Sequence, residues 1–209
     1  MTNASSLTVV GFMLAWAVGC AHHPAVRVPP RVDLTQHQTI GVINFRSSPD
    51  DELGALATRR FTESARRDQG LVRMIDFGSS VAALSSVEGN DLDAGTFRAL
   101  GREHGVQTIL VGDLTLSKTR PSVRIDSGLR SGSVAAQVEA VLAVRLVEAA
   151  TGASIWSASA RASETLGQIS VLGGENVAIG ADDPARSYAA LVDRLVEQTT
   201  RDFHAHWTR

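Results

Sequence analysis

The chain has 209 residues, a net charge of −2, and a globular composition with 44% hydrophobic and 20% charged residues. Nothing in this balance suggests a nucleic-acid partner, which would call for a basic patch or stripe. Its one cysteine excludes an intrachain disulfide, so the fold must be held together by its hydrophobic core. The length is sufficient for one domain with a substantial core.

The first twenty residues have the pattern of an export signal. Residues 7–18 form an apolar run that suits a signal peptide and is too short to span a bilayer. The run ends in Ala17-Val18-Gly19-Cys20, which resembles the lipobox of bacterial lipoproteins. We therefore predict a signal peptide over 1–19 and lipidation of Cys20 by diacylglycerol and further acyl chains such as palmitate. The alternative is a buried apolar helix with an incidental cysteine.

Residues 20–38 predict an extended tether behind the lipidated cysteine. Pro24, Pro29 and Pro30 disfavour a helix there. The tether would hold a single domain, residues 39–209, at some distance from the membrane.

The domain alternates strand and helix patterns before it ends in a hairpin and a helix. Apolar and β-branched runs predict strands over 39–45, 71–77, 108–116, 133–148 and 154–162. Helices are predicted after the cap Ser48, over 80–87, between Asp93 and Gly105, and after Asp183. Apolar residues of the last helix share one face: Tyr188, Leu191, Val192, Leu195, Val196 and Phe203. The order predicts an α+β fold, a mixed sheet with helices packed on it in a β-α-β-α-β-β-β-α-like order.

Four stretches carry a family resemblance: AVGC, IGVINF (40–45), LGREHGVQTILVGDL (100–114) and VRLVEAATGASIWSA (144–158). Together they resemble the curli assembly/transport (CsgG-like) superfamily of periplasmic lipoproteins, which includes penicillin-binding-protein activators. The resemblance implies that Gly105 ends a helix, that Gly112 lies in the next strand, and that Gly152 lies in a hairpin turn before Trp156. It implies no catalytic residue.

A search for catalytic and cofactor motifs gives a negative prediction. The sequence has no phosphate-binding loop, no HExxH and no paired-cysteine metal motif. His204 and His206 are two residues apart and would point in different directions on a helix. No serine has a nucleophile-elbow context. We therefore predict no enzyme, no cofactor and no metal site, with a small periplasmic hydrolase as a remote alternative.

Two segments are candidates for contact with partners. Residues 117–132 carry Lys118, Arg120, Arg124 and Arg130 against a single acid, Asp126. This set predicts a contact with an acidic partner or lipid head groups, although a solvated loop explains it as well. Residues 164–183 are glycine-rich around Gly173-Gly174. We expect both segments to be surface loops.

These observations predict a lipoprotein that works by contact. It would lie on the periplasmic side of the outer membrane, since Ala21 and not an aspartate follows Cys20. There it would act as a scaffold, assembly factor or regulator of an unidentified envelope protein, with homo-oligomers possible. The alternative is a subunit of an oligomeric curli-type secretion channel, because members of that family carry inserts at the two candidate segments.

Overall fold

The structure, a computed structural model, describes residues 26–48, 50–117, 120–125, 131–172, 176–180 and 184–208. The helices are α1 (Asp51–Arg66), α2 (Ser80–Ser86), α3 (Ala94–His104) and α4 (Pro184–Thr199), with 3-10 turns η1 (Leu34–Gln36) and η2 (Arg201–Phe203). The strands are β1 (Val26–Val28), β2 (Ile40–Val42), β3 (Arg46–Ser48), β4 (Met74–Asp76), β5 (Thr108–Leu116), β6 (Arg120–Ile125), β7 (Ser131–Glu148), β8 (Ser154–Leu172), β9 (Asn176–Gly180) and β10 (His206–Thr208).

The main sheet is mixed, which confirms the predicted α+β class. Its strand order is β4-β2-β5-β7-β8-β9, with β3 beside β5 and β6 beside β7. The pairs among β2, β3, β4 and β5 are parallel, and all pairs from β5–β7 onward are antiparallel. The parallel part comes from strand–helix alternation and the antiparallel part from consecutive hairpins.

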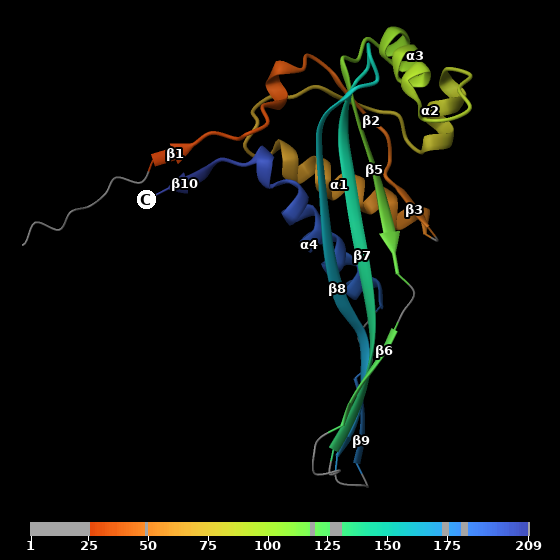
Figure 1. The fold of residues 1–209 in the computed structure, drawn as a ribbon, viewed down its shortest axis with the longest axis vertical. Helices are drawn as coiled ribbons and strands as arrows, with labels where there is room; N and C mark the ends of the chain where they lie inside the picture. The colour runs from red at the N-terminus through yellow and green to blue at the C-terminus, as the bar shows by residue number, and fades with distance from the viewer. Residues whose placement is uncertain are drawn as a thin grey trace, which may run out of the picture.

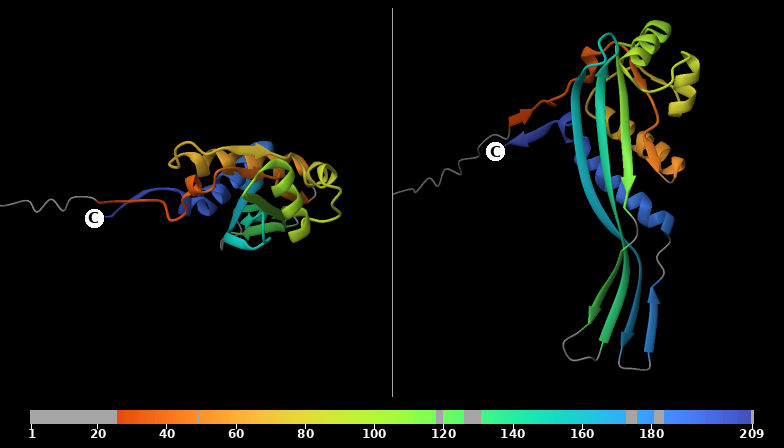
Figure 2. Two further views of the ribbon diagram at one scale, coloured as in Figure 1. Left: turned by 90° about the horizontal axis from the view of Figure 1, so that it is seen from above. Right: turned by 45° about the vertical axis from the view of Figure 1, so that its right-hand side comes forward.

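Helices α1 and α4 lie along one face of the upper sheet, and α2 and α3 pack on the opposite face at its upper end (Figures 1 and 2). The larger core joins α1 and α4 to one face, where Phe61, Leu142 and Leu195 are at most 1% exposed. A second core under α2 and α3 includes Phe97 and Ile109 on the opposite face. Alternation along β7 sends every second side chain from Val138 to Leu146 into the first core, and it places Val147 on the opposite face, in the second core.

Helix ends follow the predicted capping chemistry with one exception. Asp93 caps α3 by accepting from the Thr96 N–H, and this bond holds the pKa of Asp93 below its usual value. Gly105 ends α3 in the left-handed conformation, as predicted. The prediction of Ser48 as the cap of α1 is wrong. Ser48 ends β3, and the Asp50 carboxylate accepts from the N–H groups of Glu52 and Leu53.

The hairpin between β7 and β8 has the predicted Thr-Gly turn. The Gly152 N–H donates to the Glu148 carbonyl, and the Thr151 hydroxyl donates to the Glu148 carboxylate at 2.6 Å. Gly152 has φ +77°, and an added Cβ would overlap Ala94 of α3. Glycine is required there for both its backbone conformation and its small size.

The prediction of surface loops at 117–132 and 164–183 is wrong for the residues described. There β6, residues 131–137 of β7, residues 165–172 of β8 and β9 continue the sheet as a four-stranded antiparallel extension, which we call the arm. Figure 1 shows it projecting beyond α1 and α4. The predicted strand 154–162 therefore continues ten residues further, to Leu172.

The segment 26–38, expected to be an extended tether, is attached to the domain. The side-chain amide of Gln69, 4% exposed, accepts from the Leu34 N–H at 2.7 Å. Its nitrogen donates to the carbonyls of Val32 (2.9 Å) and Phe203 (2.7 Å). We call these three bonds the Gln69 clasp. Farther out, β1 pairs with β10, so the start of the described chain runs beside its end.

One glycine inside a helix gives a test of the packing between α1 and the sheet. We expect Gly54→Ala to lower the free energy of unfolding by about 1–3 kcal/mol, because the new Cβ would overlap the carbonyl oxygen of Phe45. In an unobstructed helix interior the same change stabilises by roughly 0.5–1 kcal/mol. Urea unfolding measures the difference. The neighbouring control, Ala55→Gly, should cost roughly 0.5–1 kcal/mol. A stabilised Gly54→Ala variant would contradict the close approach of α1 to Phe45.

Candidate interaction site

The structure places half of the predicted contact set on the arm. Arg120 pairs with Gln137 of β7, and Arg124, four residues along the same strand, pairs with Ser133. Lys118 and Arg130 lie outside the described residues, as does the predicted lipidation site Cys20. The two arginines therefore belong to a paired β-strand and not to a loop.

The arm has open edges on both sides. Among the described strands, β6 pairs only with β7, and β9 pairs only with β8. Along the body β8 is also an edge, because β9 pairs with it only from Gln168 onward. Edge strands present unpaired N–H and C=O groups, which favour pairing with another chain.

The arm also extends past the helices. The right-hand view in Figure 2 shows it as a single layer below the body, whereas helices pack on the upper sheet. A single-layer sheet gains no stability from packing against a second layer, and native proteins usually cover such faces. This geometry makes the arm a candidate for contact with another protein.

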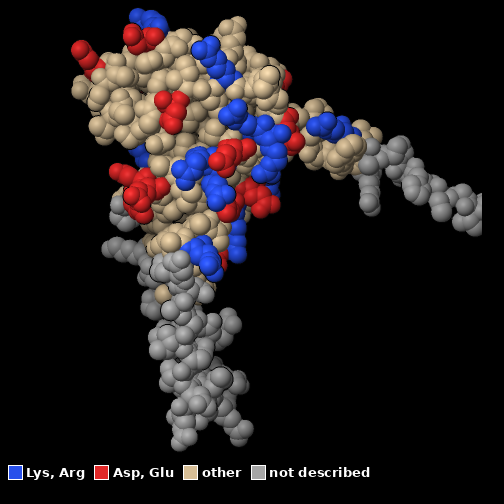
Figure 3. All heavy atoms as spheres, turned by 180° about the vertical axis from the view of Figure 1, so that it is seen from behind, with Lys and Arg blue, Asp and Glu red and all other residues tan. Residues whose placement is uncertain are grey.

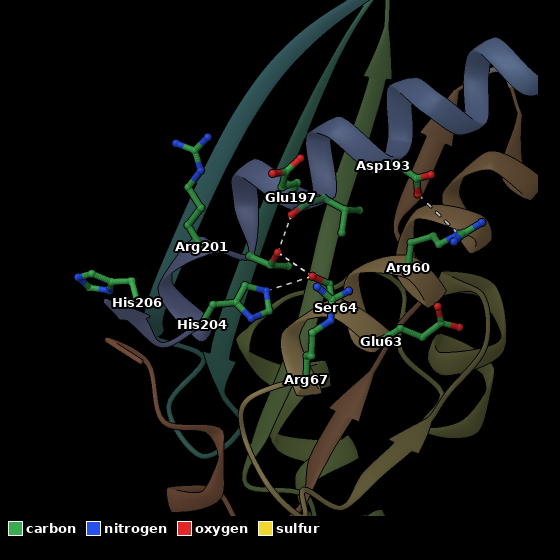
Figure 4. A pocket seen from close by; sticks show the side chains of 11 residues that line it. Arg60, Glu63, Ser64, Arg67, Asp193, Glu197, Arg201, His204 and His206 are labelled. Atoms are coloured by element: carbon green, nitrogen blue, oxygen red, sulfur yellow. Dashed lines mark hydrogen bonds and ion pairs between the residues drawn. The ribbon is translucent and has the colours of Figure 1, made fainter. Parts of the chain in front are cut away.

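A second candidate is a hollow of about 720 Å³ between the C-terminal halves of α1 and α4. Figure 4 shows its charged side chains, with arginines and acids facing each other across the opening. Three arginines (Arg60, Arg67 and Arg201) and three acids (Glu63, Asp193 and Glu197) line it. Arg60 and Asp193 approach to 3.6 Å. Because formal charges cancel, the hollow does not favour an anion over a cation.

A hydrogen-bonded chain runs along the wall of this hollow. The Ser64 Oγ lies 3.2 Å from Nε2 of His204, whose Nδ1 lies 3.1 Å from the Asp68 carboxylate. Ser64 also contacts the Thr200 hydroxyl at 3.0 Å, and that hydroxyl donates to the Val196 carbonyl. The residues occur in the order serine, histidine and acid that a nucleophile, a base and its orienting group would have. The hydroxyl protons do not fit those roles, because Thr200 donates to Val196 and Ser64 therefore donates to Thr200. The contact between Ser64 and His204 then needs a proton on Nε2, whereas a base would accept the serine proton there.

Two features argue against catalysis by this hydrogen-bonded set of side chains. Ser64 is 8% exposed, so its hydroxyl is poorly placed to meet a substrate. It also lies within α1, where backbone N–H groups bond to carbonyls one turn earlier and are not free to stabilise an oxyanion. These hydrogen bonds instead link α1 to the segment after α4. Sequence reasoning missed it, because Ser64 and Asp68 lie 140 and 136 residues from His204.

Surface charge shows no single-sign field over the helical face. Figure 3 shows basic and acidic side chains interspersed there. In the part of the chain that the structure describes, no cluster of His, Cys, Asp or Glu could hold a metal ion. None of the described helices has the length and apolar content needed to cross a bilayer. His204 follows η2 and His206 lies in β10, so the helical placement considered for them does not occur.

Comparison with known proteins gives only distant likenesses. No family model and no curated protein matches the chain. Among solved structures, the PelC dodecamer from Paraburkholderia phytofirmans has 11% identity over 84% of this chain and 96% of that chain, with a TM-score of 0.40. A putative neuraminyllactose-binding hemagglutinin homolog from Helicobacter pylori has 9% identity, 82% and 85% coverage, and a TM-score of 0.45.

Some of the similar structures are named as lipoproteins. Lipoprotein GNA1162 from Neisseria meningitidis has 17% identity over 77% of this chain and 96% of that chain, with a TM-score of 0.34. At such identities and TM-scores these likenesses assign neither a family nor an activity to this chain. Its membership of the curli assembly/transport superfamily stays a prediction.

Proposed function

We propose that this chain is a lipid-anchored envelope protein that acts without catalysis, as a scaffold, assembly factor or regulator, through protein contacts made by the arm. The observation that supports it most is the single-layer sheet of β6–β9 with open edges on both sides. Strand addition at such an edge provides backbone hydrogen bonds to a partner without a preformed pocket.

The anchor is the second part of the proposal. Export and acylation at Cys20 would place the domain on the periplasmic side of the outer membrane. We expect Cys20→Ser to abolish signal cleavage and acylation, because the thiol carries the lipid. Mass spectrometry of the purified protein and its partition between membrane and soluble fractions measure both. Unchanged processing and partition in the variant would exclude the lipid anchor.

The arm contact is tested by site-specific photo-crosslinking in cells. A photoreactive residue replaces Val123 in β6 or Val177 in β9, and the control position is Leu71, which is 99% exposed on the body. We expect specific adducts with one envelope protein from the arm positions and none from Leu71. Equal crosslinking at all three positions, or none on the arm, would contradict the proposal.

A second candidate is a subunit of an oligomeric curli-type channel. The observation that favours it is that both candidate segments form strands of one arm, with β6 at one edge and β9 at the other. Neighbouring copies could then pair β6 with β9. In this case the photo-crosslinks join copies of the chain into a ladder. Planar-bilayer recordings would show unitary conductance that is lost when residues 120–128 are deleted.

The hydrolase alternative is tested on Ser64. We expect a fluorophosphonate probe to leave Ser64 unlabelled, because it is buried and has no free backbone N–H beside it. Ser64→Ala should lower the free energy of unfolding by about 1–3 kcal/mol, because it removes hydrogen bonds to both His204 and Thr200 and each usually contributes about 0.5–1.5 kcal/mol. Labelling of Ser64 that disappears in His204→Gln would overturn the non-enzymatic assignment.

A further inference from the structure

The two ends of the described chain form a ribbon that lies apart from the main sheet. In this ribbon β1 and β10 pair antiparallel, with Arg27 opposite Trp207 and Val28 opposite His206. Figures 1 and 2 show it projecting sideways from the body, away from the helices and the arm. It is a surface that the arm contacts do not explain.

Large apolar side chains on the ribbon are exposed. Trp207 is 67% exposed and Val26 is 60% exposed. The other described tryptophan, Trp156, packs against Phe61 and Phe203 and donates its indole N–H to Asp202 at 3.0 Å. Among the described aromatic pairs, none includes Trp207. A two-stranded ribbon with three residue pairs is marginal in water, so it needs a surface to lie against.

The number of residues between Cys20 and Val26 limits how far the ribbon can lie from a membrane that holds Cys20. Val26 is six residues after Cys20. At 3.3–3.6 Å per residue, these residues span at most about 20 Å. If Cys20 carries the lipid, the ribbon cannot lie farther than that from the acylated residue at the bilayer surface.

The chemistry of the ribbon suits lipid head groups. Tryptophan prefers the membrane–water interface, where its ring is in an apolar layer and its N–H reaches polar groups. Arg27 lies directly across from Trp207, and the Arg31 side chain nearby is 84% exposed. Arg27 is the only Lys or Arg in the two strands, and Arg31 also approaches Asp202 at 3.9 Å. Figure 3 shows basic side chains at the base of the ribbon together with acidic ones. An arginine beside an interfacial tryptophan can pair with a lipid phosphate.

We infer that the β1–β10 ribbon is a second membrane contact, with Trp207 in the head-group layer and Arg27 beside lipid phosphates. This inference rests on the proposed anchor at Cys20. The ribbon would fix the orientation of the domain on the membrane, which a single flexible anchor does not do.

The test uses the full acylated protein in vesicles of phosphatidylethanolamine and phosphatidylglycerol. Lipids brominated near the head group quench tryptophan within contact distance, and acrylamide quenches tryptophan exposed to water. The difference between the native protein and Trp207→Phe isolates the emission of Trp207 from that of Trp156. We expect most of this emission to be quenched by the brominated lipid and little of it by acrylamide. Arg27→Glu should reverse this preference.

Matched controls keep the outcomes separate. Leu71→Ser changes another exposed apolar residue, 99% exposed on the body, and should leave the quenching unchanged. Flotation and mass spectrometry report the anchor independently. A floating protein whose Trp207 stays open to acrylamide overturns the ribbon contact alone. Shielding from both quenchers means that protein and not lipid covers the ribbon, which also overturns it. A protein that is neither acylated nor floating overturns the anchor and the ribbon contact together.

Discussion

Phe61→Ala is expected to lower the free energy of unfolding by about 3–5 kcal/mol. Phe61 is 1% exposed in α1, and its ring contacts three others: Phe45 at 5.5 Å, Phe203 at 5.8 Å and Trp156 at 6.3 Å between centroids. Phe45 lies between β2 and β3, Phe203 lies in η2, and Trp156 lies in β8. Removing the central ring therefore leaves a cavity where three distant parts of the chain meet.

Urea or thermal unfolding followed by circular dichroism measures this loss. Phe61→Leu, which retains much of the buried volume, should lose clearly less. Arg60→Ala is the control on the adjacent exposed position. Its ion pair with Asp193 is 3.6 Å long and solvent-accessible, so the cost should be at most about 1 kcal/mol. Equal losses at 60 and 61 would contradict the placement of the Phe61 ring at this junction.

Leu195→Ala should cost about 2–5 kcal/mol. Leu195 is fully buried in α4 with Leu191 and Val192, and all three pack on the same core as Leu142 of β7. The face of α4 predicted as apolar from its spacing is therefore a core face and not a partner surface. The matched control is Arg194→Ala, which removes an exposed ion pair with Glu164 and should cost at most about 1 kcal/mol.

The same denaturation measurement decides the point. A loss near zero for Leu195→Ala would mean that α4 does not pack on the sheet as described. If Leu195→Ala shows the expected loss of stability and photo-crosslinking from the arm is unchanged, then α4 is needed for folding and not for the contact made by the arm.

Local patterns predicted several elements of the body. The run 108–116 was predicted from its composition and matches β5, since buried strands need continuous apolar and β-branched residues. Asp93 and Gly105 bound α3 as predicted because caps are decided by neighbouring backbone groups. The Thr151-Gly152 turn was likewise visible from the sequence.

The arm could not be predicted from the same patterns. Residues 117–132 contain charges and Pro121, which suggest a solvated loop when read alone. The long hairpin of β7 and β8 supplies a template, and its register continues past an irregularity at Ala136/Gln137. Backbone groups of β6 and β9 then pair with it whatever their side chains are. Pairing with a strand that is already in place therefore overrides local composition here.

Nonlocal contacts explain why sequence reasoning missed the hydrogen bonds that join Ser64, His204 and Asp68. Ser64 and Asp68 lie one helical turn apart, which the sequence does show. Their partner His204 lies in the segment after α4, and no spacing rule connects positions 136–140 residues apart. Only the packing of α1 beside α4 brings them together.

The Gln69 clasp has a mechanical consequence for an anchored protein. Tension applied through Cys20 would reach the β1–β10 ribbon first and peel its pairs one at a time, because the load enters at the outermost pair, Val26 with Thr208. The load would then fall on the Val32 N–H, which donates to the Asp202 carbonyl at 2.9 Å, and on the three hydrogen bonds of the Gln69 side chain just after α1. Opening the ribbon alone releases residues 26–31, about 20 Å of chain at 3.3–3.6 Å per residue, while the main sheet carries no force. The domain could thus follow a moving partner or a fluctuating membrane without unfolding.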